Sequence, residues 1–486
     1  MAGNLSLIDS MNARMYVGGQ WISANDGATF NVTSPNNKEV VGVVPNGGAN
    51  ETKQAIDAAQ DAFASWSKLT AYKRAEFLLK IRDLMMQYKE ELAIIMSTEM
   101  GKVYAESCGE VNYAASFFEW FAEEGKRVYG ETIPASADNK RLLVIKQPVG
   151  VVAAITPWNF PLAMLTRKLG PALAAGCTAI VKPAPQSPLT ALAFAKITEM
   201  AGLPHGVVNI VTGDAQPISD EIFSHPSIKK VSFTGSTGVG KLLVKKSSER
   251  LIKLSLELGG HAPFIVFDDA DLEKAAAGAL ASKFRNAGQT CVCANRIYVQ
   301  RNVADKFAEI LTDKVKALQV GNSLNRDAQI GPLVNEGGLE KVQRHVTDAV
   351  AKGAKVLCGG KLASDIDAGY YYEPTVLGDV NDEMLVMFEE TFGPVAPVVV
   401  FDIVDEIIAR ANQTPFGLAA YLYTNKLDQA IQVAEALQFG IVGLNDAVPS
   451  TAQAPFGGIK ESGFGREGGH QGIEEYLSLK YISIQI

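Results

Sequence analysis

Cysteine is scarce in this chain of 486 residues, which contains only Cys108, Cys177, Cys291, Cys293 and Cys358. The number is odd and the positions are scattered, which is not typical of a disulfide framework. A chain of this length can also bury a core large enough to fold without covalent cross-links. We therefore predict that the protein works in a reducing compartment, the cytoplasm.

Histidine is equally scarce, and the five residues lie far apart in the sequence: His205, His225, His261, His345 and His470. Metal sites built from histidine and cysteine usually combine ligands at short, fixed spacings. No histidine has such a spacing to another histidine or to a cysteine. The sequence therefore predicts no bound metal ion.

Long apolar runs and an excess of positive charge are also absent. No run approaches the ~20 apolar residues that span a bilayer, and the opening segment is interrupted by Asp9 and lacks the apolar stretch of a secretory signal. The net charge is −8, whereas nucleic-acid-binding proteins are typically basic. We expect neither a membrane nor a nucleic acid as a partner.

What the chain does contain is typical of a large globular protein. Hydrophobic residues make up 47% and charged residues 20%, and the length exceeds the ~250–300 residues at which single cores stop growing. Residues 51–129 have the periodicity of amphipathic helices. Residues 141–156 predict strands interrupted at Pro148–Gly150. Strand-like and helical segments then alternate, first up to about 257 and again from 258 onward, which predicts two α/β units with parallel sheets.

Cys291 ends the segment Gly288-Gln289-Thr290-Cys291, where a turn can present a thiol to solvent. Only the thiolate is nucleophilic, so a catalytic cysteine needs either a lowered pKa or a nearby base. The alternative is an inert buried cysteine, the commonest state of a free thiol. The turn makes Cys291 a candidate nucleophile without excluding that alternative.

Two further polar residues stand in unusual surroundings. Glu257 ends an apolar strand before Gly259 and Gly260, and burial there raises a carboxyl pKa and makes a useful general base; the alternative is an ion-paired structural glutamate. Asn159, in Pro157-Trp158-Asn159-Phe160-Pro161, precedes an expected helix, and its amide suits a developing oxyanion. The alternative for Asn159 is an ordinary helix N-cap.

Three segments are candidates for binding a nucleotide. Residues 233–240 predict a strand, a glycine turn and a helix, which places N–H groups where a pyrophosphate binds, although the G-x-x-G-x-G spacing differs from the Rossmann pattern. Lys182 ends a strand, where ligands of open α/β sheets gather. Glu389 to Pro394 puts acids beside an aromatic residue. Each segment is also compatible with an ordinary loop.

Six motifs in this order make the chain resemble the aldehyde dehydrogenase superfamily over essentially its whole length: PWNFP, FTGST, ELGG, GQTC, EETFGP and PFGGIKESG. The segments YAASFFEWFAEEGKRVYG, AMLTRKLGPALAAGC and FRNAGQTCVCAN resemble the succinate-semialdehyde dehydrogenases of that superfamily. The resemblance implies that an aldehyde is oxidised through a thiohemiacetal and a thioester, with hydride transfer to NAD or NADP.

The resemblance also implies roles for individual residues. Cys291 matches the nucleophile, Glu257 the base that activates water, and Asn159 the oxyanion donor, with Lys168 and Glu467 as an auxiliary proton relay. The implied cofactor-binding residues are Lys182 and Glu390 at the two ribose positions, Gly235 and Ser236 at the pyrophosphate turn, and Phe392 near the nicotinamide. Trp158 is a further implied cofactor-binding residue.

The implied fold is α/β: a doubly wound cofactor domain (residues 1–125 and 150–257), an α/β catalytic domain (258–448) and a small β extension (126–149 and 470–486). In the superfamily this extension pairs subunits, so we expect a homodimer or homotetramer.

For the substrate we predict a short semialdehyde with a terminal carboxylate, and succinic semialdehyde in particular. We expect Asn159 and Arg167 to lie on one face of the helix that opens at Pro157–Pro161, where eight residues place them about 12 Å apart along the axis and Arg167 reaches back toward the oxyanion site. Arg285 resembles a second carboxylate-binding residue, and Ser450 a third, while Phe160 and Phe456 form the apolar walls. The alternative is that both arginines make structural salt bridges.

Cofactor choice and two rival functions complete the predictions. NAD-selective relatives often carry a glutamate where this chain has Pro185, so we expect NADP to be accepted as well as NAD.

One rival function is a dehydrogenase that passes the thioester to phosphate or CoA; Glu257 argues against it. The other is a non-enzymatic protein on the same scaffold, against which Cys291, Glu257 and Asn159 argue.

Overall fold

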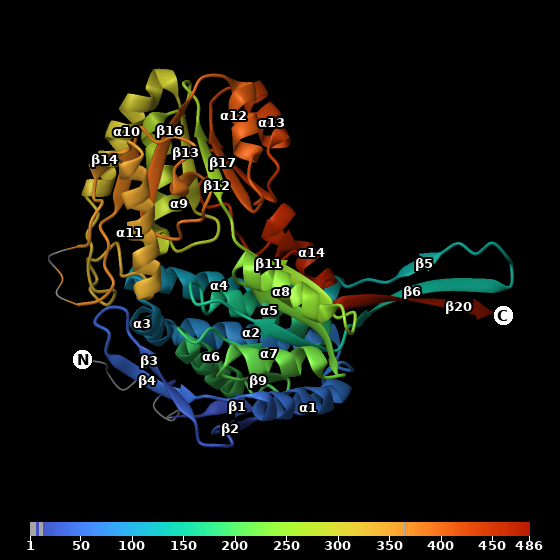
Figure 1. The fold of residues 1–486 in the computed structure, drawn as a ribbon. Helices are drawn as coiled ribbons and strands as arrows, with labels where there is room; N and C mark the ends of the chain where they lie inside the picture. Colours follow the sequence, from blue (N-terminus) through green and yellow to red (C-terminus); the bar gives the residue numbers. More distant parts are fainter. Residues whose placement is uncertain (1–5, 9–12, 364–365, 367) are drawn as a thin grey trace.

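The computed structural model describes residues 6–8, 13–363, 366 and 368–486. Two lobes lie one above the other, and a long β arm projects from the lower lobe (Figure 1). Residues 1–5, 9–12, 364–365 and 367 fall in the predicted domain segments 1–125 and 258–448. The domain prediction for these positions lies outside the described residues.

The lower lobe is built on an eight-stranded sheet whose five central strands run parallel. In sheet order the strands are β19 (Gly463–Phe464), β11 (Lys253–Glu257), β10 (Ile228–Thr234), β7 (Val151–Ile155), β8 (Thr178–Lys182), β9 (Val208–Ile210), β1 (Met15–Val17) and β2 (Gln20–Ile22). Parallel strands need crossover connections, and each of the four connections between the central strands contains a helix. These are α5 (Ala163–Ala175), α6 (Pro188–Met200), α7 (Ala215–Ser224) and α8 (Thr237–Ser247).

Four helices lie in the sequence between the edge strands β1 and β2 and the first central strand, β7, in the region where the sequence predicts helix. They are α1 (Ala49–Trp66), α2 (Ala71–Gln87), α3 (Lys89–Met100) and α4 (Tyr104–Glu124), followed by the 3-10 turn η1 (Gly125–Arg127). Helix α4 packs against α2, α3 and α5, and Phe117, Phe118 and Phe121 on α4 are fully buried there. This packing fixes α4 and α5 beside each other below the site described next. The pair β3 (Thr29–Thr33) and β4 (Val40–Pro45) forms a separate two-stranded sheet.

The upper lobe is built on a seven-stranded sheet that is parallel except at β14. In sheet order the strands are β14 (Lys355–Cys358), β15 (Thr375–Gly378), β16 (Val395–Phe401), β13 (Ala294–Gln300), β12 (Ala262–Val266), β17 (Ala419–Tyr423) and β18 (Ile441–Leu444). Its helices are α9 (Leu272–Phe284), α10 (Arg301–Lys316), α11 (Glu336–Ala351), α12 (Val404–Asn412) and α13 (Leu427–Ala436), with 3-10 turns η2 (Arg285–Gly288) and η3 (Leu385–Met387). The α/β class that the sequence predicts is confirmed.

The chain then returns to the lower lobe. After the turn η4 (Lys460–Ser462), strand β19 pairs antiparallel with β11, and helix α14 (Gly469–Glu474) leads into the arm. The arm contains β5 (Glu131–Ile133), β6 (Lys140–Pro148) and β20 (Leu477–Gln485), with β20 paired to β6 from Leu477–Pro148 to Gln485–Lys140. The division into three domains with the stated boundaries stays a prediction.

Two searches of the described residues concern membranes and metals. None of the helices in this part of the chain is long and apolar enough to cross a membrane. Among the same residues, no group of three or more histidine, cysteine, aspartate or glutamate side chains is placed to hold a metal ion.

Candidate active site

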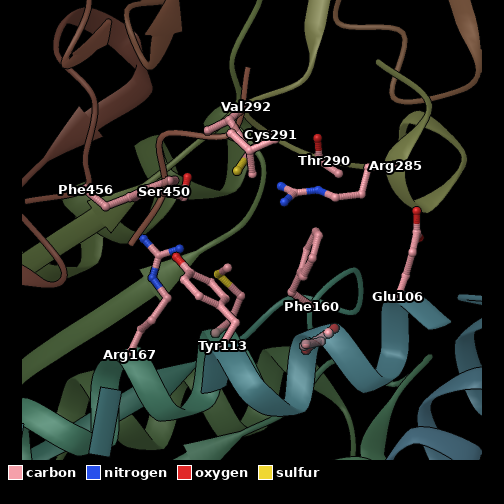
Figure 2. Close-up of a pocket in the computed structure, with 14 residues that line it drawn as sticks. Glu106, Tyr113, Phe160, Arg167, Arg285, Thr290, Cys291, Val292, Ser450 and Phe456 are labelled. Carbon is pink, nitrogen blue, oxygen red and sulfur yellow. The ribbon is translucent and has the colours of Figure 1, made fainter. Parts of the chain in front are cut away.

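A cavity of about 290 Å³ opens between α4, α5 and the loops of the upper lobe. Figure 2 shows Arg167 and Tyr113 rising from one side, Cys291 opposite them, and Arg285 and Glu106 toward the other end. The lining residues come from four segments: Glu106, Gly109, Glu110 and Tyr113; Phe160, Met164 and Arg167; Arg285, Thr290, Cys291 and Val292; Val448, Ser450 and Phe456. We call this the first cavity.

A second cavity, of about 330 Å³, lies on the other side of Cys291. It is lined by Pro157, Trp158, Asn159, Met164, Thr234, Gly235, Ser236, Glu257, Leu258, Gly259, Gln289, Cys291, Val334, Asn335, Gly337, Gly338, Lys341, Glu390, Thr391 and Phe392. Cys291 and Met164 line both cavities. The thiol therefore stands at the boundary between two chemically different spaces.

A strained turn presents Cys291. In η2, Asn286 and Ala287 have left-handed backbone angles (φ of 51° and 53°), which non-glycine residues rarely adopt. The backbone N–H of Asn286 donates to Glu106 Oε2 at 2.8 Å, and the side chain of Asn286 donates to the carbonyl of Asn159 at 3.1 Å. Strain of this kind persists only where surrounding contacts determine it, and it concentrates at functional sites.

The sequence leaves two ways to activate Cys291, a lowered thiol pKa or a nearby base, and the structure does not show a lowered pKa. Burial raises the pKa of the Cys291 thiol to about 12, and the opposing effect of the Arg167 charge is smaller. The thiol is therefore protonated at neutral pH. Its activation requires a base or a change of environment when ligands bind.

Asn159 lies in the loop between β7 and α5. Its Nδ2 donates to the carbonyl of Gln289 at 3.0 Å, and its own carbonyl accepts a hydrogen bond of 2.7 Å from Lys102 Nζ. Helix α5 begins at Ala163 with Leu162 as its N-cap, so Asn159 is not the cap. The prediction that Asn159 and Arg167 share one helix is therefore wrong, and the spacing of 12 Å does not follow.

Glu257 ends β11 and is 3% exposed. Neither carboxylate oxygen has a hydrogen-bond partner among the described residues, so the alternative of an ion-paired structural glutamate is not observed. Burial raises the pKa of Glu257 well above its usual range, and the Glu467 charge raises it further. A buried carboxylate with a raised pKa and no hydrogen-bond partner is a good proton acceptor. It can therefore take a proton from a water molecule.

Glu467 connects the two basic residues of α5. Its Oε2 lies 2.8 Å from Arg167 Nε, and its Oε1 accepts a hydrogen bond from Lys168, whose Nζ also donates to Thr234 Oγ1 at 2.6 Å. Burial alone would raise the pKa of Glu467, but the charges of Lys168 and Arg167 outweigh it and hold that pKa low. The three side chains form a buried charged cluster next to Glu257.

The structure brings the predicted substrate residues together in the first cavity. Arg167 stacks on Phe456, with 3.7 Å from its guanidinium carbon to the ring centroid, and Arg285 lies 5.2 Å from the ring centroid of Phe160. Ser450 lines the same space. Arg167 does form the salt bridge that the alternative predicts, yet its Nη2 has no hydrogen-bond partner in the described part of the chain. For Arg285 no ion pair is found among these residues.

The second cavity contains five of the six predicted cofactor residues. Ser236 is the N-cap of α8 and accepts a hydrogen bond of 3.4 Å from the Val239 N–H, so the helix starts at the cavity wall beside Gly235. Trp158 and Phe392 pack edge to face, with 5.6 Å between their ring centroids. Burial raises the pKa of Glu390 to about 7, and its Oε1 accepts the Gly260 N–H at 3.1 Å.

These groups fit a nicotinamide dinucleotide. A helix start suits a pyrophosphate, a carboxylate can accept hydrogen bonds from ribose hydroxyls, and an aromatic pair suits a flat ring. The sixth residue, Lys182, is not among those that line the cavity. It ends β8, and burial lowers its pKa to about 8, against a smaller raising effect of Asp214.

Several residues of the site were not predicted. Lys102 and Glu110 form a fully buried ion pair, and Glu110 Oε1 accepts the N–H groups of Leu162 and Ala163 at 2.9 and 3.0 Å, which anchors the start of α5. The signal in the sequence was the spacing of Glu106, Glu110 and Tyr113, three and four residues apart on one helix face. Lys341, from α11, lines the second cavity and gave no local signal.

Cys293 lies outside both linings, although it is only two residues from Cys291. It is 1% exposed, and its Sγ lies 3.4 Å from the Gly288 carbonyl and 3.7 Å from Lys283 Nζ. Both thiols are free. The two neighbouring cysteines therefore occupy different environments.

Comparison with known proteins assigns the chain to a family. The model of the aldehyde dehydrogenase family matches residues 21–482. This chain belongs to the aldehyde dehydrogenase family. The predicted resemblance, including that to succinate-semialdehyde dehydrogenases, is confirmed.

Relatives of known name support the same assignment. The chain is 54% identical, over 96% of its length and 97% of the relative's, to succinate-semialdehyde dehydrogenase [NADP(+)] GabD of Escherichia coli (strain K12). It is 53% identical, over 97% of both chains, to a glutarate-semialdehyde dehydrogenase of Pseudomonas putida. The crystal structure of an NADP-dependent enzyme from E. coli matches with a TM-score of 0.97 and 53% identity, covering 100% of both chains. This aldehyde dehydrogenase therefore shares its fold with that structure along its entire length.

Proposed function

We propose that this aldehyde dehydrogenase oxidises succinic semialdehyde to succinate with NADP or NAD. The observation that carries the proposal is the composition of the first cavity, where two arginines, Arg167 and Arg285, lie in the same lining as Cys291. Guanidinium groups bind carboxylates with two parallel hydrogen bonds. An aldehyde with a carboxylate at its far end is the substrate that such a cavity suits.

In the proposed chemistry, binding of the ligands lets the Cys291 thiol release its proton to solvent water, and the sulfur then attacks the aldehyde carbon and forms a thiohemiacetal oxyanion. The Asn159 amide and the Cys291 backbone N–H stabilise this oxyanion. The nicotinamide cofactor, when bound by the residues of the second cavity, supplies the hydride acceptor. The carbon is thereby oxidised to a thioester. Glu257 takes a proton from a water molecule that attacks this thioester, releasing the acid and returning the thiol.

Replacing Arg285 by alanine tests the substrate assignment most directly, because no ion pair to this side chain is found in the described part of the chain. We expect Arg285→Ala to lower kcat/KM for succinic semialdehyde by about 30- to 150-fold, roughly 2–3 kcal/mol, because the carboxylate loses a charged partner. Butyraldehyde lacks the carboxylate and should be affected little. Steady-state assays of reduced-cofactor formation with both aldehydes measure this difference.

Arg167→Ala should show the same selectivity, but it also removes a partner of Glu467. Its unfolding temperature must therefore be measured alongside its kinetics. Equal losses with both aldehydes in the Arg285 variant, or a wild-type preference for butyraldehyde, would contradict the assignment.

A second candidate substrate is glutarate semialdehyde, one carbon longer. It is favoured by the 53% identity to the glutarate-semialdehyde dehydrogenase of P. putida, nearly equal to that with the succinate-semialdehyde enzyme. One methylene in an apolar pocket discriminates by only about 10- to 200-fold. Comparing kcat/KM for the two semialdehydes on the same preparation decides between them.

We also propose that NADP is accepted, because Pro185 is exposed at the position where NAD-selective relatives often carry an acid. We expect kcat/KM for NAD to exceed that for NADP by less than about a thousandfold, roughly 4 kcal/mol. Lys182 is charged below its pKa of about 8, so the ratio of kcat/KM for NADP to kcat/KM for NAD should decrease as the pH rises through and above that value. A pH series of KM for both cofactors measures this, and Lys182→Met should remove the pH dependence of the ratio.

The assembly and the compartment are further proposals. Strands β5, β6 and β20 project away from both lobes (Figure 1). Leu479 and Tyr481 on β20 are exposed, as is Ile486, which follows that strand. Apolar surface of this kind favours pairing of subunits, so we propose a homodimer or homotetramer, which analytical ultracentrifugation would distinguish from a monomer. Five free thiols support a cytoplasmic location.

A further inference from the structure

The first cavity contains the hydroxyl group of Tyr113, which has no role in the chemistry proposed above. Tyr113 lies on α4, and its side chain forms part of the lining beside Arg167 (Figure 2). Its hydroxyl oxygen is buried, and no hydrogen-bond partner for it exists among the described residues. Leaving a buried hydroxyl unsatisfied costs free energy. A tyrosine in this position therefore calls for a ligand.

The surroundings of Tyr113 are unusually rich in charge. The Arg167 and Arg285 charges act on the phenol from α5 and η2, and the Glu467 charge acts on it from the buried cluster that Glu467 forms with Arg167 and Lys168. In Figure 2 the Tyr113 hydroxyl points toward the Arg167 guanidinium. The Nη2 atom of that guanidinium is also buried and without a hydrogen-bond partner in the described part of the chain. Two unsatisfied donor groups therefore lie next to each other on one wall of the cavity.

Packing holds the Tyr113 ring in this position. It contacts Phe117 one turn further along α4 in an edge-to-face pair, with 5.0 Å between the centroids and 77° between the planes. Phe117 in turn lies under Arg167, 5.6 Å from its guanidinium carbon. The phenol and the guanidinium therefore share one aromatic support, which fixes their relative positions before any ligand arrives.

We propose that the Tyr113 hydroxyl donates a hydrogen bond to the terminal carboxylate of the substrate, next to Arg167, and thereby helps select aldehydes that carry an anionic end. This inference rests on the proposed function, which it extends by a specificity-determining residue. A carboxylate offers about four acceptor sites, so one guanidinium nitrogen and one hydroxyl can bind it together. A neutral aldehyde has no group for either donor.

The protonation state of the phenol agrees with a donor. Burial raises the pKa of Tyr113, and the lowering effects of Arg167 and Arg285 are smaller. The hydroxyl therefore keeps its proton over the pH range in which the enzyme is assayed. Its role is to bind and not to transfer a proton.

Tyr113→Phe tests the proposal because it removes one oxygen and leaves the ring and its packing intact. We expect kcat/KM for succinic semialdehyde to fall by about 10- to 100-fold, mostly through KM, since a hydrogen bond to a charged group is lost. For butyraldehyde the change should stay within about twofold. Tyr104→Phe, at the start of the same helix and outside the cavity lining, is the matched control and should change neither.

A binding measurement separates this inference from the proposed function. Succinate carries the same carboxylate, so its competitive inhibition of butyraldehyde oxidation should weaken by about 10- to 100-fold in Tyr113→Phe. If the wild type prefers butyraldehyde, the proposed function fails, and succinate inhibition still decides the role of Tyr113. Unchanged succinate inhibition in Tyr113→Phe, or equal losses with charged and neutral aldehydes, would overturn the inference.

Thermal unfolding supplies an independent readout. Removing an unsatisfied buried hydroxyl should leave the unfolding temperature of the ligand-free protein equal to or higher than that of the wild type. The same excess of succinate should raise that temperature less in Tyr113→Phe than in the wild type, because stabilisation by a ligand increases with the logarithm of its concentration divided by its Kd. A lower unfolding temperature without succinate would show that the hydroxyl has a structural partner and would count against the inference.

Discussion

Replacing Cys291 by alanine should lower turnover of the aldehyde dehydrogenase by at least about a thousandfold, because Cys291 supplies the one thiol in the described linings of the two cavities. Cofactor affinity should change little, since Cys291 is one wall residue among many in the second cavity. Steady-state rates and a fluorescence titration with NADP measure the two quantities separately.

The matched control is Cys293→Ala, which changes the other thiol of the same segment. Cys293 is buried outside both linings, so this variant should keep wild-type turnover or lose it only through reduced stability. A dead Cys293 variant together with an active Cys291 variant would reverse the assignment of the nucleophile.

Glu257→Gln should slow hydrolysis of the thioester much more than the steps before it. The amide cannot accept a proton from water, and loss of a general base costs about 10²- to 10⁴-fold. Rapid mixing should therefore show a stoichiometric burst of reduced cofactor followed by slow turnover. Loss of the burst together with turnover would place Glu257 earlier in the reaction, as the base that deprotonates Cys291.

The pH dependence of turnover provides a control for the same residue. Burial favours the neutral form of Glu257 and raises its pKa, so the fraction able to act as a base increases as the pH rises. Where hydrolysis limits the rate, kcat of the wild type should increase through this titration. In Glu257→Gln the corresponding increase should be absent.

The order of secondary structure and the three candidate catalytic residues could be predicted because each rests on local patterns. Alternating strand and helix segments predict parallel α/β units, and the motifs around Cys291, Glu257 and Asn159 lie at the ends of strands and in turns, where ligands of such folds bind. The structure places all three in the lining of the second cavity. Whether they act as proposed depends on the experiments above.

Other features could not be read from the sequence because they depend on long-range packing. Helix α5 starts two residues after Pro161, since Glu110 and Lys102, about fifty residues earlier, anchor its first turn. The pairing of Arg167 with Glu467 joins residues 300 positions apart. The raised pKa of Cys291 reflects burial that no local pattern indicates. Tyr113 begins one of the segments that resemble succinate-semialdehyde dehydrogenases, but its place in an amphipathic helix indicated only a core residue, because an aromatic residue there usually belongs to the core.

The position of Cys291 between the two cavities affects the order in which this enzyme can bind and release its reactants. Under the proposed function, the dinucleotide and the aldehyde bind in different cavities that share one sulfur atom, so neither has to leave for the other to arrive. An oxidised acyl group can stay on the sulfur while the spent dinucleotide is exchanged behind it. A small thiol-alkylating reagent should likewise reach the sulfur with the dinucleotide in place, and the aldehyde, not the dinucleotide, should be the more effective protector against inactivation.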